Sequence, residues 1–392
     1  MLDFTYACGT KYVFGMDKES LVGKEIASLN KKKVLIHYGS AFAQESGLLD
    51  RVKCYLKESE IDFVCLGGVV PNPKDKLVYE GIAMVREQAC DFVLAVGGGS
   101  VIDSAKAIAC GAVYDGDFWD LTSTKATVED SIMTGSILTI PAAGSESSTV
   151  SVITREEGKL KKRIRSEIIR PKFAILDPKL AMTLPDYQVA CGACDIMVHV
   201  MERYFTNTVE VDLSDRMLEA VLCTIVKVVP KILLDRNDYD SMANMMWAGT
   251  LAHNGLFGMG RQEDWSSHDI EHELSALYDV AHGAGLAVVV PAWMKHVVSH
   301  NPLRFAQFAV RVFGCDMDFE NPMNTAVEGI KRFEKFLKSI GLPANFAELG
   351  AKREDIPHLV EKVHRNNGQF SGYFVPLSDD DIFEIYEACC IS

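Results

Sequence analysis

The first half of the chain alternates short apolar runs with longer amphipathic stretches. Between the apolar runs, apolar residues recur at spacings of three and four, which is typical of helices. The runs at 33–39, 61–69, 91–96, 136–141 and 172–178 predict strands, and 47–59, 74–88 and the segment after residue 100 predict helices. Strands and helices alternating at this spacing predict βαβ units on a parallel sheet that helices cover on both faces.

Beyond residue 186 the strand-like runs stop. Apolar residues at spacings of three and four, as in 217–234 and 323–342, predict amphipathic helices, and we expect Pro230 and Pro291 to mark helix ends. The sequence therefore predicts an α/β fold in two domains. A parallel-sheet domain over 1–185 is followed by an all-helical domain over 186–392.

Length and charge limit the classes of partner. A chain of 392 residues with 48% hydrophobic and 24% charged residues is an ordinary globular protein of two or three domains. Its net charge of −14 disfavours nucleic acid and anionic lipid as partners. A basic run at 159–165 is the exception, and we expect a solvated hairpin edge there, in which a lysine could face a cofactor phosphate.

Targeting and compartment follow from the apolar stretches and the cysteines. The first residues carry charge at Asp3 and Lys11 and lack a long apolar core, so we expect no secretory leader. The longest uncharged stretch, 241–260, contains four glycines and is too polar for a membrane span. Eleven irregularly spaced cysteines indicate reduced thiols and a cytoplasmic location. The C-x-x-C at Cys191 and Cys194 has no second pair, so packing is expected rather than a zinc site.

A glycine-rich turn, Gly97-Gly98-Gly99-Ser100, joins an expected strand to an expected helix. Glycines let the backbone approach a phosphate closely, and a helix N-terminus offers free N–H groups. Ser100 could add a hydroxyl donor, and Asp103 suits the first turn of a helix. The spacing is not the G-x-G-x-x-G of the common dinucleotide fingerprint, so a plain turn without ligand remains the alternative.

Histidines and one aspartate form the sharper pattern in the second half. Asp195 and His199 stand four residues apart on an expected helix, as do His268 and His272, so each pair shares a helix face. His282 precedes a glycine that we expect to end a helix or open a turn. Two such pairs can converge on one cation, and three imidazoles with one carboxylate suit a divalent first-row metal.

Spacing alone does not choose the ligands. His253 and His296 lie in the same half of the chain, and any of these histidines could instead pack in the core or cap a helix. The donor set accepts Fe²⁺, Zn²⁺, Co²⁺ or Ni²⁺.

Several segments taken together resemble the iron-dependent, or group III, alcohol dehydrogenases, and most closely their butanol dehydrogenase-like aldehyde reductases. The segments that carry the resemblance are GGGSVIDSAKAIA, LTIPAAGSESS, FAILDP followed by TLP, the D-x-x-x-H at 195–199, and DWSSHDIEHELSALYDVAHG. They occur in the family's order and span nearly the whole chain. The resemblance implies an N-terminal nicotinamide dinucleotide-binding α/β domain, a helical metal-binding domain and a homodimer.

The resemblance also implies roles for individual residues. It assigns the metal to Asp195, His199, His268 and His282. It places His272 near the nicotinamide and not among the ligands. The implied cofactor contacts are Gly39, Asn72, Gly98, Gly99, Ser100, Asp103, Thr139, Lys161 and Leu180.

One position bears on the choice between NADP and NAD. Members that prefer NAD often carry an acidic residue after the first strand, where it holds the ribose 2′-hydroxyl. This chain has Tyr38-Gly39-Ser40 there, without a carboxylate, which favours NADPH over NADH. The segment also departs from the subgroup's usual glycine and serine at Ala41-Phe42.

The implied chemistry is reversible hydride transfer between the nicotinamide and a small aldehyde or primary alcohol, with the metal as Lewis acid and His272 as proton relay. Apolar residues with few cations around 250–300 favour a small apolar aldehyde such as butanal; they are Leu256, Phe257, Met259, Trp265 and Trp293. The alternatives are a glycerol or polyol dehydrogenase and a dehydroquinate synthase-like lyase of the same architecture. A metallohydrolase and a non-catalytic metal-storage protein are more distant.

Overall fold

The computed structural model describes residues 1–39, 42–367 and 370–391. The chain forms two compact units, one of residues 7–184 and one that joins residues 1–6 to the chain from Pro185 onward. The first six residues thus group with the second unit, although the sequence pattern placed them in the first. One of the contacts that holds them there is the Leu2 amide, which donates to the Gly260 carbonyl at 2.8 Å.

The first unit contains the expected parallel sheet. Its six strands lie in the order β1-β8-β5-β4-β2-β3, and all neighbouring pairs are parallel. The strands are β1 Lys11–Phe14, β2 Lys33–Gly39, β3 Asp62–Val69, β4 Phe92–Gly97, β5 Met133–Leu138 and β8 Phe173–Leu176. Every residue of β4 is buried, as expected for a central strand covered on both faces.

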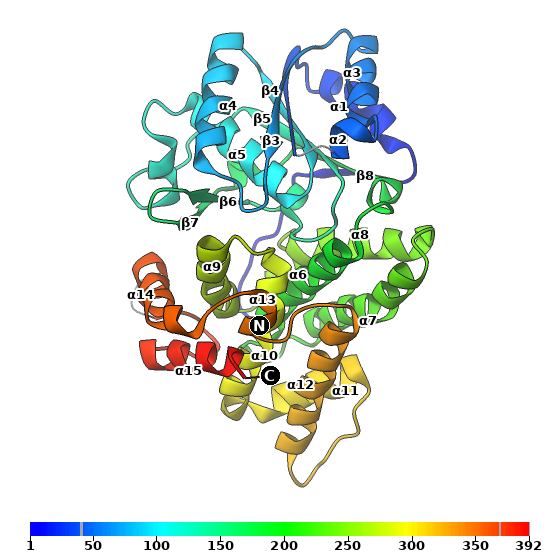
Figure 1. Ribbon diagram of the computed structural model, residues 1–392. Coiled ribbons are helices and arrows are strands. Elements are labelled where there is room, and N and C mark those ends of the chain that lie inside the picture. The colour runs from blue at the N-terminus through cyan, green and yellow to red at the C-terminus, as the bar shows by residue number, and fades with distance from the viewer. Residues whose placement is uncertain (40–41, 368–369, 392) are drawn as a thin grey trace. The chain divides into compact units, whose positions relative to one another are not determined.

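Helices cover both faces of this sheet (Figure 1). Alternate residues of the strands, such as Val34, Ile36 and Leu94, pack with α1 and α3, whereas α5 packs against β4 from the other face. The helices are α1 Val22–Ser28, α2 Phe42–Glu45, α3 Leu48–Glu58, α4 Asp75–Gln88 and α5 Gly99–Val113. A separate antiparallel hairpin joins β6 Val150–Arg155 to β7 Leu160–Arg165, as expected at 159–165, but the edge is only partly solvated because Lys161 and Ile164 are buried.

The second unit is helical, and its described residues form no strand. The helices are α6 Asp186–Tyr204, α7 Asp212–Leu234, α8 Tyr239–His253, α9 Ser266–Tyr278, α10 His282–Val297, α11 Pro302–Phe313, α12 Pro322–Ser339, α13 Phe346–Leu349, α14 Ile356–Asn367 and α15 Asp379–Cys389. Short 3₁₀ segments complete the chain: Lys18–Leu21, Phe118–Thr122, Ser145–Ser147, Glu167–Ile169, Pro178–Ala181, Leu256–Gly258, Val298–His300 and Arg353–Asp355. In the described part of the chain, no helix has both the length and the apolar character that crossing a bilayer requires.

Two prolines were expected at helix ends, and this expectation was wrong. Pro230 lies inside α7 and Pro291 lies inside α10. A proline within a helix removes one backbone hydrogen bond and disfavours a straight helix. The apolar periodicity continues across both residues, however, and burial of the apolar face keeps each helix continuous.

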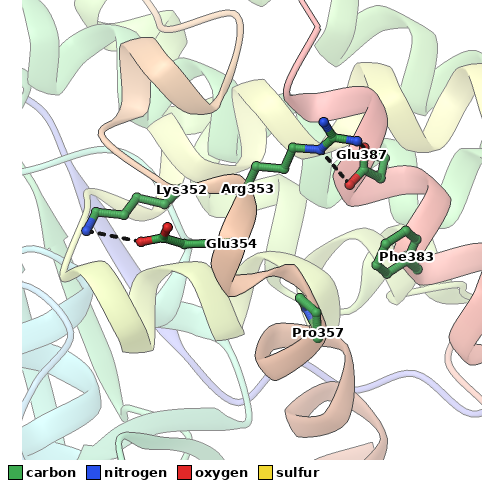
Figure 2. Close-up of a pocket in the computed structure, with 6 residues that line it drawn as sticks. All are labelled: Lys352, Arg353, Glu354, Pro357, Phe383 and Glu387. Carbon is green, nitrogen blue, oxygen red and sulfur yellow. Dashed lines mark hydrogen bonds and ion pairs between the residues drawn. The ribbon is translucent and has the colours of Figure 1, made fainter.

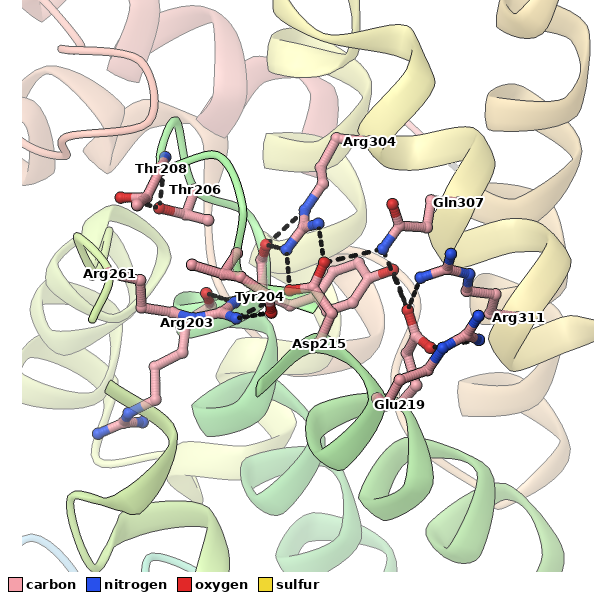
Figure 3. A network of polar contacts seen from close by, with 12 residues as sticks. Arg203, Tyr204, Thr206, Thr208, Asp215, Glu219, Arg261, Arg304, Gln307 and Arg311 are labelled. Atoms are coloured by element: carbon pink, nitrogen blue, oxygen red, sulfur yellow. Dashed lines mark hydrogen bonds and ion pairs between the residues drawn. The ribbon is translucent and has the colours of Figure 1, made fainter. Parts of the chain in front are cut away.

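A network of buried charges holds the C-terminal end of α6 (Figure 3). Arg261 Nη1 donates to the Arg203 carbonyl at 2.9 Å, and Arg304 Nε donates to the Tyr204 carbonyl at 2.7 Å. Both guanidinium groups also bind Asp215. Cations at this end complement the helix dipole, so the network fixes a helix whose middle carries Asp195 and His199.

Candidate active site

Three helices of the second unit carry the predicted metal ligands. Asp195 and His199 lie one turn apart on α6, where both are buried. His268 lies in the first turn of α9, and His282 is the first residue of α10. Because α10 packs against both α6 and α9, these four side chains come together although 87 residues separate the first from the last.

The three imidazoles converge on one oxygen of the Asp195 carboxylate. Asp195 Oδ1 lies 2.9 Å from His199 Nδ1, 3.9 Å from His268 Nε2 and 3.8 Å from His282 Nε2. The ligand atoms of Asp195, His268 and His282 all lie within 4.8 Å of one another. His199 differs in that its Nδ1 also lies 2.9 Å from the Asp195 carbonyl, and its ring centroid is 4.7 Å from that of His268.

The electrostatics of this cluster suit a cation. Burial by itself raises the pKa of the Asp195 carboxyl, but the three facing imidazoles lower it well below its usual range. Burial, followed by the neighbouring imidazoles of His199 and His282, lowers the pKa of His268 well below its ordinary value. The cluster therefore holds an ionised carboxylate beside an unprotonated imidazole.

An unpartnered atom tests whether the residues fit a metal. His268 Nε2 is buried and has no hydrogen-bond partner among the described residues, yet it points toward Asp195 Oδ1. A buried polar atom without a partner is costly unless a ligand satisfies it. Nitrogen and carboxylate donors at this spacing fit a divalent first-row cation.

Of the other histidines, His253 and His272 lie beside the cluster, and ligand atoms of His272, His282 and Glu271 lie within 4.8 Å of one another. The ring of His253 lies 4.4 Å from that of His199, and His253 Nδ1 is 3.2 Å from Arg203 Nη2. His272 lies one turn beyond His268, with its ring centroid 5.4 Å from that of His282. His296 instead lies 3.0 Å from an Asp381 oxygen and 3.6 Å from a Glu384 oxygen, away from the cluster.

The glycine after His282 opens a helix and does not end one. A Cβ at Gly283 would fall 2.0 Å from the Cys191 carbonyl oxygen, so only glycine lets α10 approach the backbone of α6 this closely. Cys191 and Cys194 are buried free thiols, which agrees with the expected packing role.

The glycine-rich turn of the first unit begins α5. Gly98 is the N-cap and offers no side chain, so the first N–H groups of the helix face outward from the strand end. A Cβ at Gly97 would fall 2.4 Å from the Val101 side chain, and one at Gly99 would fall 3.3 Å from Ala143. The turn thus lies beside the 143–145 loop, with the free N–H groups that an anion site uses.

The remaining predicted cofactor contacts fall into distinct surroundings. A Cβ at Gly39 would lie 3.4 Å from Val101, which places Gly39 beside the glycine-rich turn. Lys161 Nζ donates to Asn72 Oδ1 at 3.0 Å, so these two predicted contacts lie together. The Thr139 amide donates to the Gly97 carbonyl at 3.1 Å, and the Leu180 side chain packs in the core.

Asp103 is bound within the first unit. Both oxygens of Asp103 accept internal hydrogen bonds, from the Ser145 hydroxyl and the Val152 amide, so the structure gives this carboxylate a role in holding the loop. Ser40 and Ala41, which belong to the segment that favours NADPH over NADH, lie outside the described residues.

Lys106 is a residue that the sequence reasoning missed. Its fully buried ammonium donates to Ser145 Oγ at 2.9 Å, Ser148 Oγ at 3.2 Å and the Val150 carbonyl at 2.8 Å. Burial lowers the pKa of Lys106 to about 8. A lysine inside the apolar stretch AKAIACGA was the available signal, because such a residue must find internal partners.

Two surface hollows lie elsewhere on the second unit. One of about 520 Å³ is lined by Lys352, Arg353, Glu354, Pro357, Phe383 and Glu387 (Figure 2). Its charges pair with one another, as Arg353 with Glu387 at 2.7 Å, so it offers no catalytic group. A smaller hollow of about 310 Å³ borders Val280 and Ala281, the segment that leads into His282.

Comparison with known proteins places the chain in a family. The model of the iron-containing alcohol dehydrogenases matches residues 9–178, and that of the C-terminal part of the Fe-containing alcohol dehydrogenase family matches residues 189–390. NADH-dependent butanol dehydrogenase A of Clostridium acetobutylicum is 38% identical, with 99% of each chain covered. The NADPH-dependent aldehyde reductase YqhD of Escherichia coli is 35% identical, with 99% of this chain and 100% of that protein covered.

A solved crystal structure of a butanol dehydrogenase also matches the whole chain. The crystal structure of NADH-dependent butanol dehydrogenase A from Thermotoga maritima superposes with a TM-score of 0.96 at 37% identity, covering 100% of this chain and 99% of that one. The chain therefore belongs to the iron-containing alcohol dehydrogenase family, and its activity is NAD(P)H-dependent oxidoreduction between alcohols and aldehydes.

Proposed function

We propose that the protein interconverts small apolar aldehydes and primary alcohols, with butanal as the model substrate, and that Asp195, His199, His268 and His282 hold its divalent cation. The observation that carries this proposal is the convergence of three imidazoles on Asp195 Oδ1, with His268 Nε2 left without a partner among the described residues. The names of the relatives, butanol dehydrogenases and an aldehyde reductase, support the substrate class.

In this proposal the glycine-rich turn binds the cofactor and His272 transfers a proton. When bound, a divalent cation supplies Lewis acidity toward the carbonyl oxygen, and a nicotinamide supplies or accepts the hydride. The N–H groups of the turn at Gly98, Gly99 and Ser100 bind the pyrophosphate. His272, half-buried beside His282, carries the proton that the substrate oxygen gains or loses at one of its ring nitrogens.

Partly buried apolar side chains between residues 256 and 265 favour an apolar substrate. The indole of Trp265 lies 5.1 Å from the His268 ring and is only partly buried, as are Leu256 and Met259. Phe257 and Trp293, which the sequence pattern grouped with them, are buried in the core and do not line an open surface.

The finer assignments are proposals of the same kind. The end of β2 at Tyr38 and Gly39 carries no carboxylate, which favours NADPH, although the relatives include enzymes named for each cofactor. Eleven free thiols support a reducing, cytoplasmic location. The family resemblance supports a homodimer.

The test is cofactor oxidation with butanal after chelation, with Fe²⁺, Zn²⁺ or Ni²⁺ added back separately and NADPH and NADH run in parallel. We expect chelation to abolish turnover and a divalent cation to restore it, with NADPH oxidised faster. Tight nucleotide binding without turnover on any metal would contradict the substrate class and turn the search to polyols. Unchanged turnover after complete metal removal would contradict the metal site.

His272 is tested by replacement with Ala. Removal of a proton relay lowers turnover by a factor on the order of 100 and changes its pH profile, while metal content stays at the wild-type level. Metal analysis of the purified variant accompanies the kinetics. Full activity with an unchanged pH profile would remove His272 from the mechanism.

A further inference from the structure

Two buried carboxylates stand directly behind two of the imidazoles. Glu202 Oε1 lies 2.7 Å from His268 Nδ1, and Glu271 Oε2 accepts from His282 Nδ1. Glu202 is 3% exposed and Glu271 is fully buried. In both cases the opposite ring nitrogen, Nε2, faces Asp195 Oδ1.

We propose that Glu202 and Glu271 are positioning residues of the metal centre, each holding the Nδ1–H of one imidazole so that an unprotonated Nε2 faces the cation. This inference rests on the proposed metal site. A carboxylate on Nδ1 selects the tautomer whose lone pair is on Nε2, fixes the ring plane and increases the basicity of the ligand nitrogen.

The two carboxylates differ in how well the protein satisfies them. Glu202 also accepts from the Ser267 hydroxyl at 2.6 Å and from the Trp265 amide at 2.7 Å. Glu271 Oε1, by contrast, is buried without a hydrogen-bond partner among the described residues. Glu202 is therefore held in place by the fold itself, whereas Glu271 has fewer partners: His282 Nδ1 and, at 3.4 Å, the Ser275 hydroxyl both donate to its Oε2.

A glycine on α10 makes room for Glu271. A Cβ at Gly285 would fall 2.4 Å from Glu271 Oε1 and 2.8 Å from its Cγ. Gly285 lies three residues after His282, so one turn of α10 supplies both the imidazole and the space for the carboxylate that orients it. A methyl group at this position displaces the carboxylate without removing its charge.

The experiment measures metal affinity and the stability of the metal-free protein together. The full-length protein is stripped with a chelator and titrated with Co²⁺ in competition with a coloured chelator, and the visible absorption of bound Co²⁺ reports its coordination. The variants are Glu202→Gln, Glu271→Gln and Gly285→Ala, with Glu273→Gln as the matched control. Glu273 is an equally buried carboxylate on the same helix that pairs with Lys362.

We expect Glu202→Gln and Glu271→Gln to weaken Co²⁺ binding by about 10- to 100-fold and to alter the Co²⁺ spectrum, and Glu273→Gln to leave both unchanged. Metal-free Glu271→Gln melts at or above the wild-type temperature, because the substitution replaces a buried carboxylate whose Oε1 has no hydrogen-bond partner among the described residues. Gly285→Ala weakens binding in the same direction, and it carries the test if the Glu271→Gln protein does not fold.

Three results would overturn the inference. They are wild-type affinity in the glutamine variants, an equal loss in Glu273→Gln, and a loss of affinity that follows a lower melting temperature of the metal-free protein. Wild-type protein and His268→Ala are titrated first. If wild type binds no Co²⁺, or His268→Ala binds as wild type does, the proposed metal site itself fails and not only the role of the two glutamates.

Discussion

Two buried polar networks in the helical unit differ in how completely the protein satisfies them. Around Asp215, both oxygens of the carboxylate face donors that the chain supplies, from Arg261 at 2.8 Å, from Arg304 and from Gln307 at 3.0 Å. Around Asp195, three imidazoles face one carboxylate oxygen, and His268 Nε2 has no partner within the described part of the chain.

The difference separates a structural network from a binding site. A network whose members are paired internally contributes to the fold and has little left to offer a ligand. A network in which a buried polar atom has no internal partner can gain that partner from a ligand. Both networks involve α6, one at its last carbonyls and one at its middle, so the same helix is fixed by the first and used by the second.

The strongest test breaks the Asp215 network. Asp215→Asn leaves the guanidinium of Arg261, which is fully buried, without its carboxylate. Loss of one partner of a buried ion pair costs about 3–5 kcal/mol of unfolding free energy. Denaturant titration of the metal-free wild-type and Asp215→Asn proteins measures this loss of unfolding free energy. A midpoint equal to that of wild type would show that the network does not stabilise the fold.

The second test adds a divalent cation to the Asp195 network of the metal-free protein. Free cation at 1,000 times its dissociation constant stabilises the folded state by about 4 kcal/mol. We expect a corresponding rise in melting temperature on adding Zn²⁺ to the stripped protein, and no rise in His268→Ala. The same rise in both proteins would place the stabilising ion elsewhere.

A third test concerns His37, a buried histidine of the sheet whose two ring nitrogens both have hydrogen-bond partners. His37 is fully buried; its Nδ1 lies 2.9 Å from the Leu66 carbonyl and its Nε2 lies 2.8 Å from Ser104 Oγ. Burial lowers the pKa of His37 to about 4, below the value of about 6.5 in the unfolded chain. The contribution of neutral His37 to the free energy of unfolding is therefore complete above pH 6.5. It is lost progressively as the pH falls from 6.5 to 4, by about 3 kcal/mol in all.

Equilibrium unfolding between pH 7 and pH 4 measures this loss against His37→Gln, which has no group that titrates in this range. The wild-type protein is expected to lose more stability than the variant over this interval. Equal pH slopes for the two proteins would mean that His37 is solvated or protonated in the fold.

The sequence predicted the parallel sheet and the helical second half because apolar runs and three-four spacings are local signals. It missed β1, Lys11–Phe14, which is only four residues long and half or fully exposed, so its short apolar run at Tyr12–Phe14 is a weak signal. It placed the fourth predicted strand at 136–141, whereas the corresponding β5 begins at Met133 and ends at Leu138, because the chain leaves the sheet before Pro141.

The candidate site divides in the same way. Residues four apart on a helix, such as Asp195 and His199, share one face, so their spacing in the sequence was enough to predict them as candidate ligands. Glu202 and Glu271 gave no such signal, because a single glutamate on a helix is most often solvated. Their contacts with His268 and His282 span 66 and 11 residues, which only tertiary packing creates.

The four predicted metal ligands differ in solvent exposure, and this difference affects how fast the cation exchanges with solvent. The side chains of Asp195, His199 and His268 are 5–7% exposed, whereas that of His282 is 23% exposed. An incoming chelator or competing ion must displace ligands one at a time, and it can approach only where a ligand is accessible. Exchange of the cation with solvent is therefore expected to begin at His282, so the residence time of the metal depends on this one imidazole more than on the buried carboxylate.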